Sequence, residues 1–132
     1  MANASTYLES AVLNHVLRNV AFTSPPQVFL ALYLSDPTDA DTGTEVTGGG
    51  YVRQRVIFDA PVASGGESTA SNSQAIEFPV ATTPWGNVIY FGIKDAATGG
   101  SLLLHGSLLR SRDIQVGDQI RFDVGALTLA VV

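Results

Sequence analysis

The hydrophobic pattern near the N-terminus predicts one amphipathic helix. Apolar residues recur every three or four positions between residues 8 and 20, so that they line one stripe of a helix. Thr6-Tyr7-Leu8-Glu9 fits a capping box, and consecutive prolines at 25 and 26 prevent continuation. We therefore expect a helix over about residues 6–21. The stripe consists of Leu8, Val12, Leu13, Val16, Leu17 and Val20.

The segment from Val28 to Leu34 is apolar at every position, which is typical of a strand covered on both faces. The helix, a second sheet or a partner subunit must supply that cover. The simpler interpretation packs the helix stripe on one face of the sheet. In the alternative, the helix or this strand contacts a neighbouring subunit. The expected interface residues are then Leu8, Val12, Val16, Phe29 and Tyr33.

Alternating patterns further along predict a mainly β chain. Apolar runs flank Asp95 to Gly100 within the stretch Trp85 to Leu109, which indicates a β-hairpin. Short alternating segments at 51–58, 76–80 and 120–131 bring the total to about seven strands. We expect an antiparallel β-sandwich or flattened barrel with one N-terminal helix, forming a single domain over residues 1–132.

Pairing between two of these segments would bring opposite charges together. If the 51–58 and 76–80 strands are neighbours, Glu77 faces Arg53 or Arg55. Such a contact at an exposed site adds little stability. We interpret it as ordinary sheet chemistry and not as a functional site.

Composition narrows the classes of partner. Charged residues make up 14% of the chain and hydrophobic residues 45%, which favours a surface partly covered by other subunits. A net charge of -5 and a single Lys argue against nucleic acid and anionic membranes. No apolar run approaches the ~20 residues of a spanning helix, and the N-terminus lacks a signal-peptide pattern. We expect cytoplasmic synthesis and no membrane insertion.

Candidate metal ligands gather in the polar loop from Ser35 to Gly50. Its carboxylates suit calcium chemically, but Gly43 stands where the EF-hand pattern wants an oxygen ligand. Turn formation explains the same residues. There is no cysteine, and we interpret His15 and His105 as packing residues, the latter with a local hydrogen bond, so no cofactor is expected. The loop carboxylates are Asp36, Asp39, Asp41 and Glu45.

Candidate catalytic and ligand-binding residues are few. A glycan-degrading enzyme needs two carboxylates across a cleft, whereas those available lie in expected turns or on an alternating strand, and we expect no enzyme. An aromatic side chain could stack on a sugar, although a lone Trp more often covers the end of a core. The carboxylates are Asp95, Asp113, Asp118 and Asp123, and the aromatic candidates are Trp85, Tyr51 and Tyr90.

Short segments spread along the chain form a collinear pattern. They include the N-terminal Ala4-Ser5-Thr6-Tyr7-Leu8-Glu9, Leu13-Asn14-His15-Val16-Leu17-Arg18, Ser35-Asp36-Pro37-Thr38-Asp39, Gly48-Gly49-Gly50-Tyr51-Val52-Arg53-Gln54, Phe78-Pro79-Val80-Ala81-Thr82, Trp85-Gly86, Gly92-Ile93-Lys94-Asp95-Ala96-Ala97-Thr98-Gly99-Gly100 and Leu104-His105-Gly106. In these segments the chain resembles a family of small tailed-bacteriophage virion proteins, usually labelled tail fibre or minor tail proteins.

The resemblance implies a structural component of a virion, made in the host cytoplasm and assembled on the tail or baseplate. Its partners would be copies of itself and other virion proteins, and the family supplies no catalytic positions to carry over. Two alternatives stay open. One is a capsid decoration protein, and the other is a carbohydrate-binding module that recognises a host-surface glycan through Trp85, Tyr51 or Tyr90.

Overall fold

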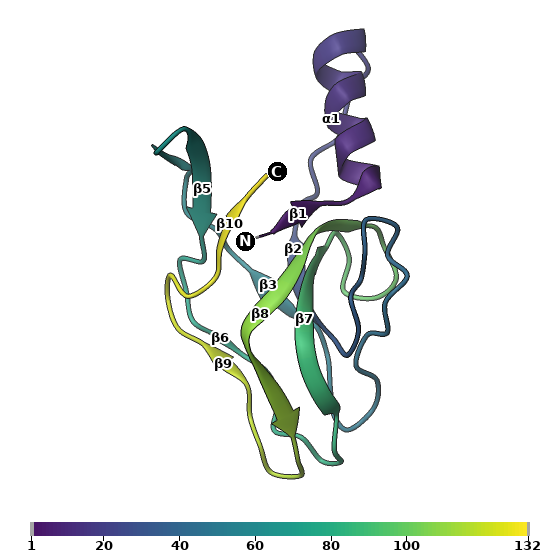
Figure 1. Cartoon of the computed structure of the whole chain (residues 1–132), viewed down its shortest axis with the longest axis vertical. Helices are drawn as coiled ribbons and strands as arrows, with labels where there is room; N and C mark the ends of the chain where they lie inside the picture. Colours follow the sequence, from purple (N-terminus) through teal and green to yellow (C-terminus); the bar gives the residue numbers. More distant parts are fainter. Residues whose placement is uncertain (1, 132) are drawn as a thin grey trace.

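The computed structural model describes residues 2–131, and this part of the chain is mainly β with one helix (Figure 1). The expected fold class is therefore confirmed. Its elements are β1 (Asn3–Ala4), α1 (Thr6–Arg18), β2 (Val28–Tyr33), β3 (Gln54–Val56), β4 (Val62–Ser64), β5 (Glu67–Ser71), β6 (Ile76–Glu77), β7 (Gly86–Lys94), β8 (Leu102–Ile114), β9 (Arg121–Phe122) and β10 (Thr128–Ala130).

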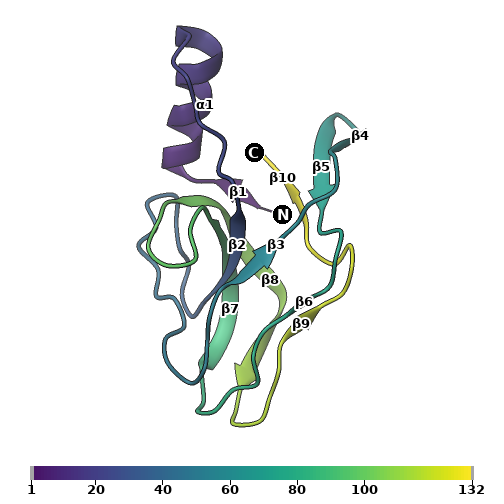
Figure 2. The same ribbon diagram turned by 180° about the vertical axis from the view of Figure 1, so that it is seen from behind.

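The strands form three antiparallel sheets. The largest has the order β1-β8-β7-β2-β3, and two smaller sheets have the orders β10-β5-β4 and β6-β9. The described residues contain ten strands instead of about seven, because several of the additional ones are only two or three residues long. The sheets do not close on themselves, so the barrel alternative is not realised. The small sheets lie across the core from the large one (Figures 1 and 2).

The hairpin expected between Trp85 and Leu109 is present as β7 and β8. Its reversal is held by Asp95, whose Oδ1 accepts a hydrogen bond from the Ser101 N–H at 2.7 Å. Gly99 and Gly100 both have positive φ, which the reversal requires and L side chains rarely adopt. The local signals of turn chemistry and strand periodicity were thus sufficient to locate the centre of the fold.

Strand β2 lies inside the large sheet and is buried on both faces from Leu30 to Tyr33. Leu30 and Leu32 pack in the core with residues of the smaller sheets, such as Ile76. On the other face, the Tyr33 hydroxyl donates a hydrogen bond to Asp41 in the loop that follows β2. The chain itself therefore supplies the cover for this part of β2.

The ion pair of Glu77 is formed with an arginine other than the two suggested by the sequence. Strand β6 pairs with β9, and Glu77 forms an ion pair with Arg121. Arg53 turns instead toward Glu45, with its side chain only 8% exposed. The condition for the expected Glu77 contact with Arg53 or Arg55, ladder pairing of the two strands, is not met, because β3 pairs with β2.

Gly92 provides a test of the packing between β7 and its neighbours. A Cβ atom added at Gly92 would lie 2.7 Å from Leu102 Cδ1 and 3.0 Å from Tyr33 Cε1. We expect Gly92→Ala to lower the free energy of unfolding by about 1–3 kcal/mol because both neighbours are packed in place. Urea denaturation measures the change. Ser68→Ala, at an exposed strand position, should stay within about 0.5 kcal/mol of the wild type; equal effects would refute this packing.

Candidate functional site

Helix α1 has no buried residue over its whole length from Thr6 to Arg18. Ser5 is the N-cap, with its Oγ accepting a hydrogen bond from the Leu8 N–H at 3.1 Å. The helix ends at Arg18 and not near residue 21, because Asn19 adopts a left-handed conformation with φ of 56°. The N-cap is therefore Ser5 and not Thr6, and the expected capping box is not formed, because the residue three positions after Ser5 is Leu8 and not Glu9.

The helix projects beyond the end of the large sheet instead of lying against it (Figures 1 and 2). Val16 is 69% exposed and Leu17 is 72% exposed, so the expectation that the stripe packs on a sheet face was wrong. Only Leu8, at the base of the helix, packs against the core. We call the outward residues the exposed helix face: Leu13, Val16 and Leu17.

The five expected interface residues have different surroundings. Val12 and Val16 are exposed on α1, whereas Leu8 is partly buried against the core. Phe29 is half-buried on β2, and Tyr33 is only 1% exposed. Tyr33 is thus occupied within the chain and offers no surface to a partner in this conformation. For the five residues as a set, the interface stays a prediction.

The aromatic residues form one end of the core. Trp85 is 4% exposed, and its Nε1 donates a hydrogen bond to the Gly49 carbonyl at 2.9 Å. Its ring meets Tyr51 edge-on with centroids 5.5 Å apart, and Tyr51 in turn stacks with Phe78. Tyr90 is half-buried on β7. Trp85 therefore covers the core end and presents no open stacking face.

Carboxylates of the 35–50 loop pair with basic side chains of the same chain. Asp41 binds the buried Lys94 ammonium and accepts a hydrogen bond from Tyr33 at 2.9 Å. Asp39 lies 2.8 Å from His105 Nε2. His105 was expected to bond locally, whereas its partner is 66 positions away in the sequence. Among residues 2–131 no group of three or more His, Asp or Glu is placed to hold a metal ion.

Arg53 and Glu45 form the most extensive of these pairs. The guanidinium donates two hydrogen bonds of 2.8 Å to the carboxylate and two more, also 2.8 Å, to the carbonyls of Ala96 and Gly99. The Tyr51 hydroxyl donates to Glu45 at 2.6 Å. Arg53 thereby ties the acidic loop to the turn of the central hairpin.

Burial shifts the ionisation of the groups in this network. Burial raises the pKa of Glu45, but the hydrogen bonds from Arg53 and Tyr51 and the charge of Arg53 outweigh it and hold that pKa below its usual 4.5. Burial, together with the hydrogen bond to Asp41, raises the pKa of Tyr33 above its usual range. Both observations describe a closed structural network with its charges matched, not a reactive centre.

The remaining sequence candidates do not form a catalytic arrangement. Asp95 holds the hairpin turn, and Asp118 accepts a hydrogen bond from the Gln115 N–H in another turn. Asp113 bonds the Gln115 side chain, and Asp123 pairs with Arg121. These contacts stabilise turns and strand ends. His15 lies on the helix surface, with Nδ1 3.2 Å from the Val20 carbonyl.

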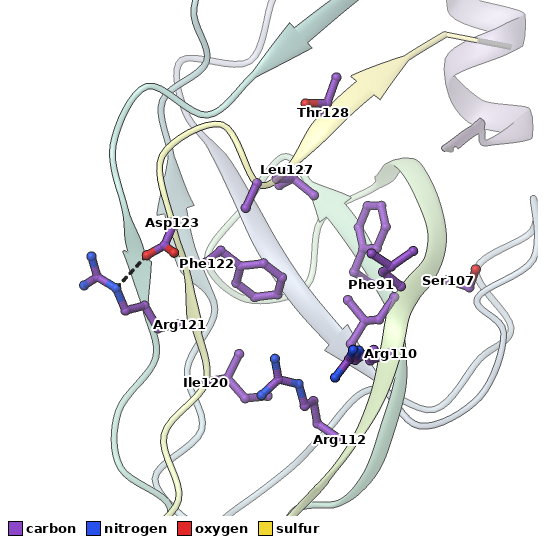
Figure 3. A pocket seen from close by; sticks show the side chains of 13 residues that line it. Phe91, Ser107, Arg110, Arg112, Ile120, Arg121, Phe122, Asp123, Leu127 and Thr128 are labelled. Carbon is purple, nitrogen blue, oxygen red and sulfur yellow. Dashed lines mark hydrogen bonds and ion pairs between the residues drawn. The ribbon is translucent and has the colours of Figure 1, made fainter.

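A groove that sequence reasoning missed lies between β8 and the segment from Ile120 to Thr128 (Figure 3). Its volume is about 780 Å³. Phe91, Ile120 and Leu127 are buried at its base, and Arg110 and Arg112 point into it from β8. The two arginines are close in the sequence, but nothing local to them indicates that a distant segment would face them.

Glu45 tests the importance of the buried pair. Glu45→Gln leaves the Arg53 guanidinium without its counter-charge, which should cost about 3 kcal/mol of unfolding free energy. Because the pKa of Glu45 is lower in the folded chain, its contribution is fully present above pH 4.5 and is lost as the pH falls through the folded value. Urea denaturation between pH 3 and 7 should therefore show a flatter acid limb for Glu45→Gln.

The matched control is Glu77→Gln, which removes a carboxylate from an ion pair whose side chains are 53% and 51% exposed. Exposed pairs contribute about 0–1 kcal/mol, so this variant should stay close to the wild type. Similar losses in the two variants would contradict a special role for Glu45.

Comparison with known proteins identifies a family. Within residues 2–131, no helix combines the length and apolar character needed to cross a bilayer. The sequence matches no curated protein. A family model described as "Podophage GP4 fiber I protein gp80" matches residues 3–130, nearly the whole chain and in line with the resemblance found in the sequence. The chain therefore belongs to this family of phage tail fibre proteins.

Proposed function

We propose that this chain is a structural subunit of the phage tail fibre or its attachment site, and that copies of it assemble through helix α1. The observation that carries this proposal is a helix of 13 residues with none of them buried. Isolated helices of this length are marginal in water, and most helices in proteins depend on packing of their apolar face. Contact with other copies would supply that packing.

The spacing of the exposed helix face suits contact between helices. Val16 and Leu17 follow Leu13 by three and four positions on the helix. This is the spacing with which helices pack side by side along an apolar seam. The three residues are between 56% and 72% exposed in the single chain, so their burial would yield a large hydrophobic gain.

A small apolar hollow at the base of α1 adds to this surface. Its volume is about 220 Å³, and it opens beside the helix where the C-terminal strand ends. It would accept an apolar side chain from another copy packed along the helix. The hollow is lined by Ala4, Leu8, Glu9, Val12, Leu13 and Val131.

The alternatives receive less support. The family description speaks for a fibre and against a capsid decoration protein. A carbohydrate-binding module would need an open aromatic face, whereas Trp85 is buried and Tyr51 packs between Phe78 and Trp85. A structural role also requires no catalytic group, in keeping with a family of fibre proteins.

Assembly through α1 predicts a homo-oligomer in solution. We expect light scattering at tens of micromolar to give a mass several times that of the 13.9 kDa chain. The double variant Val16→Gln with Leu17→Gln should dissociate to monomers, because two apolar side chains at the seam become polar. Arg18→Gln, on the side of the helix away from Val16, is the control and should leave the mass unchanged.

A monodisperse wild-type monomer at this concentration would refute assembly through α1. An oligomer that persists in the double variant would refute the helix as the contact while leaving oligomerisation intact.

Location in the virion can be tested separately. Gold-labelled antibodies against the purified chain should mark the tail of the phage particle in electron micrographs. Labelling spread over the head would instead support the capsid decoration alternative.

A further inference from the structure

The groove between β8 and the 120–128 segment is independent of α1 and has a different chemistry. Its base is apolar, with Ile120 and Leu127 each about 5% exposed and Phe122 half-buried above them. Figure 3 shows Phe122 and the two β8 arginines turned toward the same opening. Such a combination of apolar base and cationic rim suits a ligand that is both apolar and acidic.

Arg110 and Arg112 have no counter-charge among residues 2–131. Within that part of the chain, neither takes part in an ion pair or a side-chain hydrogen bond, whereas Arg121 on the opposite rim is paired with Glu77 and Asp123. The two unpaired guanidinium groups stand at the groove of a protein whose net charge is -5. Their concentration there favours a carboxylate-bearing partner, which Arg binds with bidentate geometry.

The backbone of β8 is also open at the groove. Strand β1 pairs with β8 only at Leu104 and His105. On its other side, β8 pairs with β7. Ser107 is opposite Tyr90, and the next paired residue of β8, Arg112, is opposite Val88, so five positions along β8 correspond to only two along β7. Residues 108–111 therefore bulge and have no ladder partner on either side among the described residues. An extended polypeptide can bind such free backbone groups while its side chains enter the groove.

Exposed apolar side chains on the rims favour a polypeptide over a polysaccharide. Leu109 lines the groove and is fully exposed, and Phe122 beside the base is half-buried. Apolar contacts of this kind stabilise protein interfaces, whereas a polyanionic sugar would need only the arginines and hydrogen-bonding groups.

A second copy of the chain is a poor occupant. Its acidic residues are dense only in the loop from Asp36 to Glu45, where Asp39, Asp41 and Glu45 are already paired with His105, Lys94 and Arg53. Outside that loop, successive acidic residues are at least five positions apart. Contact between two β8 bulges would also bring four like charges together, which is unfavourable.

We propose that this groove is the docking site for an extended segment of a different protein, one that carries acidic side chains interspersed with apolar ones. The arginines bind its carboxylates, and Phe122, Leu109 and the apolar base bind its apolar side chains. The surface thus joins this chain to an unlike neighbour, in contrast to the exposed helix face.

The test is selection of a randomised ten-residue peptide library against the purified full chain. We expect the wild type to enrich peptides in which Asp or Glu alternate with apolar residues. The double variant Arg110→Glu with Arg112→Glu should not enrich them. Thermal unfolding followed by circular dichroism checks that the variant, changed only at exposed positions, keeps its fold.

The affinity of the most enriched peptide is then measured for the wild type and for each variant. This separates the contribution of the arginines from that of Leu109. The double arginine variant should weaken binding at least tenfold, and Leu109→Ser should weaken it measurably. Arg18→Glu is the control for a change of charge elsewhere and should have no effect. Hydrogen exchange at residues 106–112 should slow when the peptide is bound.

Several results would overturn the proposal. These are the same enriched composition in wild type and double variant, no enrichment at all, or binding that is insensitive to Leu109→Ser. Polygalacturonate that competes with the peptide, and itself binds with the same dependence on the arginines, would assign the groove to an anionic polysaccharide instead.

Discussion

The bidentate pair between Arg53 and Glu45 is the interaction on which the rest of the structure most depends. It joins the acidic loop to β3, and through the carbonyls of Ala96 and Gly99 it also holds the turn of the central hairpin. A buried guanidinium is tolerable only if its donors are satisfied, and here four hydrogen bonds to protein oxygens accomplish this. The loop can then lie over the face of the sheet that contains Tyr33.

The position of this loop over β2 determines which apolar residues of the chain remain exposed. With the loop in place, β2 is buried within a single chain from Leu30 to Tyr33. Several exposed apolar residues are then carried by α1, which projects from the sheet. Several of the few charged residues are thus used in pairs within the chain, and one helix is left apolar outside.

The distribution of cations distinguishes the two proposed contact surfaces. Arg53, Lys94 and Arg121 have carboxylate partners in the chain, whereas Arg110 and Arg112 are without one among residues 2–131. An apolar helix favours contact between identical copies, since it carries no like-charge repulsion. A cationic groove disfavours such contact and favours an acidic partner. A fibre subunit with both surfaces would bind its own copies at one end and a different protein at the other.

The sequence by itself determined the elements whose signals are local. The turn residues from Asp95 to Gly100 located the central hairpin, and the apolar periodicity before Pro25 located the helix to within a few residues. The continuous apolar run from Val28 correctly indicated a strand covered on both faces. Each of these signals depends on neighbours within a few positions, where backbone preference and side-chain period act directly.

Only the tertiary structure decided which element covers which. The pairs formed by His105 with Asp39 and Lys94 with Asp41 span 66 and 53 positions, and no periodicity encodes such distances. The same is true of the exposed helix face and of the groove at Arg110 and Arg112. A hydrophobic pattern states that a side chain needs cover, but the chain's path in space determines whether a strand, a loop or another molecule provides it.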